Sequence, residues 1–65
     1  MSVTINGEKA EAAGKLLSDY LKDAGYDIQR IAVELNGEIV PKVNYDSTRL
    51  QDGDTVEIVS FVGGG

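Results

Sequence analysis

Apolar and polar residues alternate at the start of the chain, where polar positions separate Met1, Val3 and Ile5. This period of two predicts a short strand with one buried face. Asn6-Gly7 follows and favours the left-handed backbone of a type I′ turn. We therefore expect a hairpin whose weakly marked return strand covers residues 8–12.

The next segment has the period of an amphipathic helix over residues 15–24. Its apolar positions recur at three- and four-residue spacings and form one stripe: Leu17, Tyr20, Leu21 and Ala24. Gly25 is placed to end the helix as a C′ residue. Gly14 is only a tolerable N-cap, so the start of the helix is poorly marked.

Alternation returns over residues 31–35 and predicts another strand, after which Asn36-Gly37 repeats the hairpin signal. The return strand over residues 38–40 is interrupted by Pro41, which suits the edge of a sheet. Both signals favour a second hairpin after the helix.

The last third of the chain begins irregularly. Residues 42–50 favour a short helical turn with Tyr45 and Leu50 as anchors in the core. Gln51-Asp52-Gly53-Asp54 is typical of a turn. Residues 55–62 are rich in β-branched side chains and predict the strongest strand.

This order of elements leaves one helix to cover one face of one sheet. The last strand then fits beside the first as a parallel central pair, because the connection between them is long enough to cross over. The expected fold is α+β with a mixed sheet and the β-grasp (ubiquitin-like) topology.

Composition narrows the chemistry. The 65 residues include no cysteine and no histidine, so the usual nucleophile, general base and metal ligands are missing. A chain this short also supports only one core. We expect no catalytic residue, no metal site and no bound cofactor.

The net charge of −5 is opposite in sign to that of a nucleic-acid-binding protein. It fits a basic protein partner, although the same charge can serve solubility alone. The sequence has neither an apolar run of membrane-spanning length nor a signal-peptide pattern. A cytoplasmic protein without membrane or nucleic-acid partners is the expectation.

The chain closes with Phe61-Val62-Gly63-Gly64-Gly65. We divide it into a domain over residues 1–62 and a glycine tail over residues 63–65. Glycine has no Cβ, so such a tail can approach a partner closely. A linker remnant is the alternative reading of these glycines.

The length, the hairpin around Leu35–Glu38, the turn over residues 51–54 and the glycine end together resemble the ThiS-type sulfur carriers of thiamine biosynthesis. The resemblance covers the whole chain. It implies that an E1-like, ThiF-type enzyme uses ATP to adenylate the carboxylate of Gly65, which then becomes a thiocarboxylate. Gly63 and Gly64 would serve in recognition of the tail.

The resemblance also implies partners. Sulfur would come from a donor such as a cysteine desulfurase and would pass to a ThiG-type thiazole synthase. The chain would then be a protein cosubstrate rather than an enzyme. Two alternatives are a small subunit of molybdopterin synthase with the same tail chemistry, and a ubiquitin-like modifier or interaction module.

A partner interface is expected on the last strand. If Val56 and Ile58 face the core, alternation places Val59 and Phe61 on the opposite face. Exposed apolar neighbours often mark a partner surface, to which Val62 would also contribute. The alternative is that a β-bulge or the 42–50 loop covers them.

Overall fold

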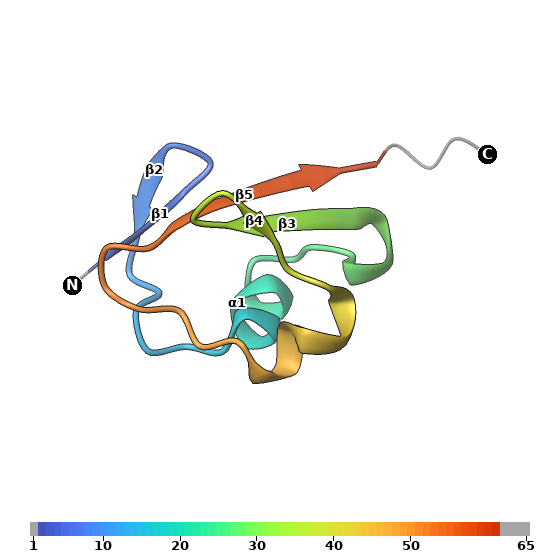
Figure 1. Ribbon diagram of the computed structural model, residues 1–65, viewed down its shortest axis with the longest axis horizontal. Coiled ribbons are helices and arrows are strands. Elements are labelled where there is room, and N and C mark those ends of the chain that lie inside the picture. Colours follow the sequence, from blue (N-terminus) through green and yellow to red (C-terminus); the bar gives the residue numbers. More distant parts are fainter. Residues whose placement is uncertain (1, 62–65) are drawn as a thin grey trace.

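The computed structural model describes residues 2–61, which form one five-stranded sheet with a helix on one side (Figure 1). The elements in chain order, with η marking a short 3-10 helix, are β1 (Val3–Ile5), β2 (Glu8–Ala10), α1 (Leu17–Asp23), η1 (Ile28–Arg30), β3 (Ile31–Leu35), β4 (Glu38–Ile39), η2 (Lys42–Ser47) and β5 (Thr55–Ser60). The predicted α+β class and order of elements are confirmed. Val62 and the glycine tail lie outside the described residues.

The sheet has the strand order β2-β1-β5-β3-β4, so β5 lies at its centre. β1 pairs with β5 in parallel, with Ile5 opposite Val56. β3 pairs with β5 in the antiparallel sense, with Val33 opposite Ile58. The predicted parallel central pair, and with it the β-grasp topology, is confirmed.

Both Asn-Gly dipeptides form the predicted hairpin turns. Asn6 and Asn36 each have φ of 51°, while Gly7 and Gly37 have φ of 84° and 87°. A type I′ turn requires positive φ at both central positions, and asparagine and glycine are the residues that adopt it at least cost. The local sequence therefore determines where each hairpin turns.

The two asparagine side chains also join each hairpin to the central strand. The amide of Asn6 accepts a hydrogen bond from the Ile58 N–H at 2.7 Å and donates one to the Ile58 carbonyl at 3.2 Å. Asn36 Oδ1 accepts from the Thr55 N–H at 2.9 Å, and its Nδ2 donates to Asp54 Oδ1 at 3.0 Å. Each turn thus holds β5 as well as its own two strands.

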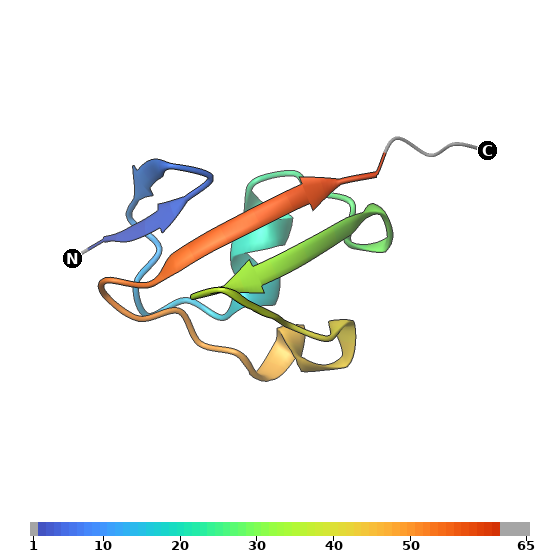
Figure 2. The same cartoon turned by 45° about the horizontal axis from the view of Figure 1, so that its top comes forward.

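The core lies between the inner face of the sheet and the layer that contains α1 and η2 (Figure 2). Its members come from alternate strand positions, from α1 and from the connecting segments: Val3, Ile5, Ala12, Leu17, Leu21, Ile31, Val33, Tyr45, Leu50, Val56 and Ile58. The predicted anchors Tyr45 and Leu50 are confirmed. Burial of each large aliphatic side chain contributes about 1.5–3 kcal/mol.

Helix α1 begins later than predicted, at Leu17 rather than at residue 15. The Gly14 N–H donates to the Leu50 carbonyl at 2.7 Å, and the Leu50 N–H donates to the Lys15 carbonyl at 2.8 Å. The Leu17 N–H donates to the Thr48 carbonyl, also at 2.7 Å. The predicted start is wrong because this stretch pairs with a distant segment instead of forming a helical turn.

The end of α1 follows the prediction more closely. Gly25 has φ of 85°, and the Tyr26 N–H donates to the Leu21 carbonyl at 2.9 Å, as in a Schellman motif. The buried stripe differs in two positions, because Ser18 is buried and Ala24 is exposed. Ala24 lies beyond the last helical residue, so it does not extend the packed face.

The edge strands are shorter than predicted. β2 ends at Ala10 rather than at residue 12, and β4 covers only two residues before Pro41. The central strand β5 also ends early, at Ser60. Its pairing continues for one more residue, because the Phe61 N–H donates to the Arg30 carbonyl, next to β3, at 2.7 Å. In the sequence, only Phe61 and Val62 separate the end of β5 from the glycine tail.

Candidate functional site

Strand β5 presents apolar side chains on both faces of the sheet. Val56 and Ile58 are buried, whereas Val59 and Phe61 are 56% and 55% exposed. Neither a bulge nor the 42–50 loop covers them, so their predicted exposure is confirmed. Their use as a partner interface stays a prediction, and Val62, the third residue of that interface, lies outside the described residues.

Sequence reasoning missed a further exposed apolar residue on this outer face. Ile39 on β4 is 74% exposed and lies opposite Glu34 of β3. The signal was present, because a two-residue Asn36-Gly37 turn sets the register that pairs Ile39 with Glu34. Val43 of η2, 87% exposed, was also missed, and no pattern in residues 42–50 marked it.

Two glutamates lie on the outer face between these apolar side chains. Glu34 of β3 is directly opposite Glu57 of β5, and the neighbouring pair along the same strands is Ala32 with Val59. The salt bridges found within residues 2–61 are Lys15–Asp23 and Asp27–Arg30, so neither glutamate takes part in one. Two like charges therefore lie opposite each other beside the exposed apolar side chains, without an ion-pair partner among the described residues.

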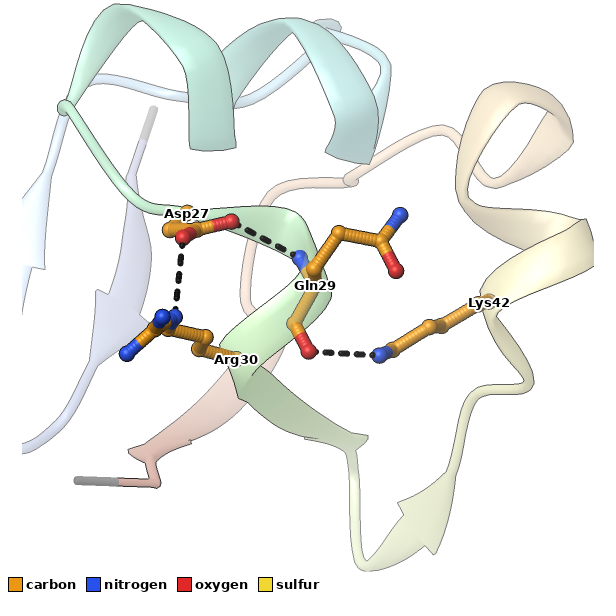
Figure 3. A network of polar contacts seen from close by, with 4 residues as sticks. All are labelled: Asp27, Gln29, Arg30 and Lys42. Atoms are coloured by element: carbon orange, nitrogen blue, oxygen red, sulfur yellow. Dashed lines mark hydrogen bonds and ion pairs between the residues drawn. The ribbon is translucent and has the colours of Figure 1, made fainter. Parts of the chain in front are cut away.

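A polar network supports the end of β5 through η1 (Figure 3). Asp27 accepts a hydrogen bond from the Gln29 N–H at 3.1 Å and lies 3.4 Å from Arg30 Nε. Lys42 Nζ donates to the Gln29 carbonyl at 3.2 Å, which ties η2 to the same turn. Because the Arg30 carbonyl receives the Phe61 N–H, this network holds the strand end from which the tail continues.

Both aspartates of the predicted turn accept hydrogen bonds from backbone N–H groups. Asp52 Oδ1 accepts the Ser2 N–H at 2.7 Å, and Asp54 Oδ2 accepts the Gln51 N–H at 2.8 Å. The Asp54 N–H donates to the Gln51 carbonyl at 3.0 Å, so the turn itself is confirmed. It lies directly before β5 and fixes where that strand begins.

Two tyrosines have shifted pKa values. Burial raises the pKa of Tyr45, while a backbone hydrogen bond with Val33 opposes that rise. Burial also raises the pKa of Tyr20, and the nearby Tyr26 adds to the effect. Both hydroxyls therefore stay protonated near neutral pH, where they cannot act as general bases.

The part of the chain that the structure describes encloses no pocket, and it gathers no three potential metal ligands. None of its helices is long and apolar enough to cross a membrane. The sequence-predicted tail residues Gly63, Gly64 and Gly65 lie outside it.

Known proteins with similar sequences agree with the family resemblance of this chain. A model of the ThiS family matches residues 3–65. A thiazole synthase of Paramagnetospirillum magneticum is 44% identical over 66 residues, which cover 100% of this chain but only 20% of that protein. The sulfur carrier protein ThiS of Thermus thermophilus is 36% identical over 63 residues, with 97% of this chain and 98% of the relative covered.

The fold agrees with these sequence matches. The crystal structure of a thiamine biosynthesis protein (ThiS) from Geobacter metallireducens aligns with a TM-score of 0.82 at 33% sequence identity, over 100% of both chains. The family match, the full-length relative and the shared fold all cover the same domain. On this evidence the chain belongs to the ThiS family.

Proposed function

We propose that the carboxylate of Gly65 is the working group of this chain and carries sulfur as a thiocarboxylate. As a member of the ThiS family, the chain is a sulfur carrier protein of thiamine biosynthesis. The observation that carries the proposal is that the family match runs through the glycine end to residue 65. It also favours the thiamine pathway over molybdopterin synthesis and over a role as a modifier.

The chemistry requires activation, because a carboxylate is a poor electrophile with no good leaving group. In the proposed first step an oxygen of the Gly65 carboxylate attacks the α-phosphate of ATP, and pyrophosphate leaves. The terminal sulfur of a donor persulfide then attacks the acyl carbon, AMP leaves, and an acyl disulfide forms. A thiol of the partner enzyme next attacks the donor's sulfur in that S–S bond, which releases the Gly65 thiocarboxylate and leaves a disulfide on the partner side. ATP is consumed in the active site of the partner, so this chain needs no bound cofactor.

The chain is accordingly a protein cosubstrate in this proposal, and the catalytic groups belong to its partners. We assign adenylation to an E1-like enzyme of the ThiF type and sulfur delivery to a donor such as a cysteine desulfurase. A ThiG-type thiazole synthase receives the sulfur. The thiazole synthase of P. magneticum supports this last partner, since it contains a region similar to the whole chain.

The folded domain supplies the affinity that the tail lacks. Fixing each flexible tail residue costs about 1–2 kcal/mol of conformational entropy. Contacts from the outer face, with Val59 and Phe61 exposed and Val62 next in sequence, offset that cost. Gly63 and Gly64 then allow close approach to the nucleotide, because they have no side chain. Since activation consumes ATP, we propose a cytoplasmic location.

The test compares tail variants with the unmodified chain. Deletion of Gly65, or addition of a tryptophan after it, should abolish ATP-dependent thiocarboxylate formation and leave the melting temperature unchanged. Each chain is incubated with a ThiF-type enzyme, ATP and a sulfur donor, and intact mass reports the exchange of oxygen for sulfur. Normal loading of the extended chain would contradict the proposal, and a large fall in melting temperature would show that the tail is structural.

A further inference from the structure

The backbone of β5 alternates in the direction of its hydrogen bonds. On the β3 side, the Asn36 N–H donates to the Thr55 carbonyl at 2.7 Å, and the Phe61 N–H donates to the Arg30 carbonyl at 2.7 Å. In an antiparallel pair the bonded residues are every second one along the strand. The odd-numbered residues of β5 therefore use their backbone groups on β3.

The even-numbered residues face the opposite edge, where β1 lies. The Asn6 N–H donates to the Val56 carbonyl at 2.9 Å. β1 has ended by then, and the side-chain amide of Asn6 takes over by bonding both backbone groups of Ile58. The next even-numbered residue is Ser60. Its N–H and carbonyl face the same edge, and no residue from 2 to 61 bonds to either of them.

This edge is already built to receive an amide. At Ile58 the carboxamide of Asn6 places one acceptor and one donor where a neighbouring strand would place its own. At Ser60, the next even-numbered residue towards the tail, the backbone N–H and carbonyl face this same edge, and the side chain is exposed. An extended peptide could therefore continue the ladder from the point at which Asn6 stops.

We propose that an extended segment of the adenylating enzyme pairs with β5 at Ser60 and so sets the direction in which the glycine tail enters the active site. The proposal rests on the proposed function of Gly65. Its physical reason is that glycines offer no side chains for recognition, so a partner must recognise the tail through main-chain hydrogen bonds. A ladder that starts on the rigid strand orients the tail before its flexible part begins.

Adjacent side chains favour this occupant over a second copy of the chain. Val59 and Phe61 flank Ser60 in sequence and are exposed on the outer face, so one partner segment can contact them and the Ser60 backbone together. Two copies would each bring a net charge of −5 to the contact. A basic enzyme surface instead complements that charge and the nearby Glu57.

The test uses Ser60→Pro, with Ser60→Ala as its matched control. Proline lacks an N–H, but the Ser60 N–H is not part of the β3 ladder, so the strand pairing can persist. Alanine removes only the hydroxyl and keeps the N–H. We expect Ser60→Pro to weaken binding to the purified ThiF-type enzyme by about tenfold, as for loss of a main-chain hydrogen bond whose partner is left buried. Ser60→Ala should bind as the unmodified chain does.

Melting curves and amide spectra accompany the titrations. If Ser60→Pro lowers the melting temperature strongly, a chain prepared by chemical synthesis with an ester in place of the Ser60 amide removes the same N–H without the proline ring. Binding of this ester chain with unchanged affinity would overturn the proposal. So would a concentration-dependent dimer of the free chain that Ser60→Pro abolishes, because a second copy would then occupy the edge.

Three further outcomes test the choice of partner and separate this inference from the proposed function. Weakened binding to thiazole synthase with unchanged binding to the adenylating enzyme would overturn the choice of partner. Unchanged binding of Ser60→Pro, together with failed loading after deletion of Gly65, would overturn the inference and leave the sulfur-carrier chemistry standing. Loading of the chain that lacks Gly65 would instead contradict the proposed function itself.

Discussion

The two faces of the sheet differ in almost every respect although they share the same strands. The inner face of the sheet faces the layer that contains α1 and η2 (Figure 2). Val33 and Val56 are fully buried there. The outer face exposes Val59 and Phe61 beside Glu34 and Glu57, which lie opposite each other. Strand alternation assigns stability to one face and leaves the other available for recognition.

The largest expected effect comes from the same substitution on the two faces of β5. Val56→Ala should lower the free energy of unfolding by about 2–3 kcal/mol, because it removes buried methyl groups and leaves a cavity. Val59→Ala should change it by less than about 0.5 kcal/mol, because the side chain is exposed. Denaturant unfolding of both variants measures the difference. Similar losses would mean that the outer face is packed in solution.

The next comparison tests how strongly the side-chain hydrogen bonds of the two turn asparagines hold β5 in the sheet. Asn6→Ala removes two partly buried hydrogen bonds to Ile58, whereas Asn36→Ala removes exposed ones to Thr55 and Asp54. Both asparagines have the same φ of 51°, so the backbone cost of alanine is matched. We expect Asn6→Ala to be the more destabilising by about 1 kcal/mol. Equal losses in thermal or denaturant unfolding would leave only the shared turn geometry as their role.

Much of this fold could be predicted from local sequence because its signals are local. Each Asn-Gly turn and the glycine after α1 specify their own backbone conformation. The start of α1 could not be predicted in the same way. It depends on hydrogen bonds from Gly14 and Leu17 to residues 48–50, which lie far away in sequence. Long-range pairing overrode a pattern that was correct about the buried face of the helix at Leu17 and Leu21.

The candidate site likewise has features that the sequence predicts and features that it does not. Alternation along β5 was sufficient to predict the exposure of Val59 and Phe61. The positions of Ile39 and of the Glu34–Glu57 pair depend on register between strands, which a single strand pattern does not contain. The open edge at Ser60 depends further on where β1 ends. Such features need the assembled sheet.

A third prediction concerns the inner layer at high pH. Burial raises the pKa of Tyr45 in the folded state above its ordinary value of 10.0, so above about pH 10 the unfolded chain loses this proton more readily. The folded state then binds more protons, and stability should fall as pH rises from 10 through the folded pKa. Tyr45→Phe should lose less stability over this range. Denaturant unfolding at several pH values measures this dependence in both proteins. An identical dependence in the two would assign the loss of stability to other groups such as Tyr20.

The smallest effect concerns the outer face alone. Like charges directly opposite each other in a sheet are destabilising, so Glu57→Gln should raise the free energy of unfolding by about 0.2–1 kcal/mol. Glu38→Gln is the matched control, because it makes the same change in net charge on β4 opposite Leu35. Denaturant unfolding at low and high salt measures both, and the gain from Glu57→Gln should shrink as salt screens the pair. Equal gains from the two substitutions would trace the effect to net charge. A larger, salt-sensitive gain from Glu57→Gln would show that the outer face retains an unfavourable charge pair that the fold does not require.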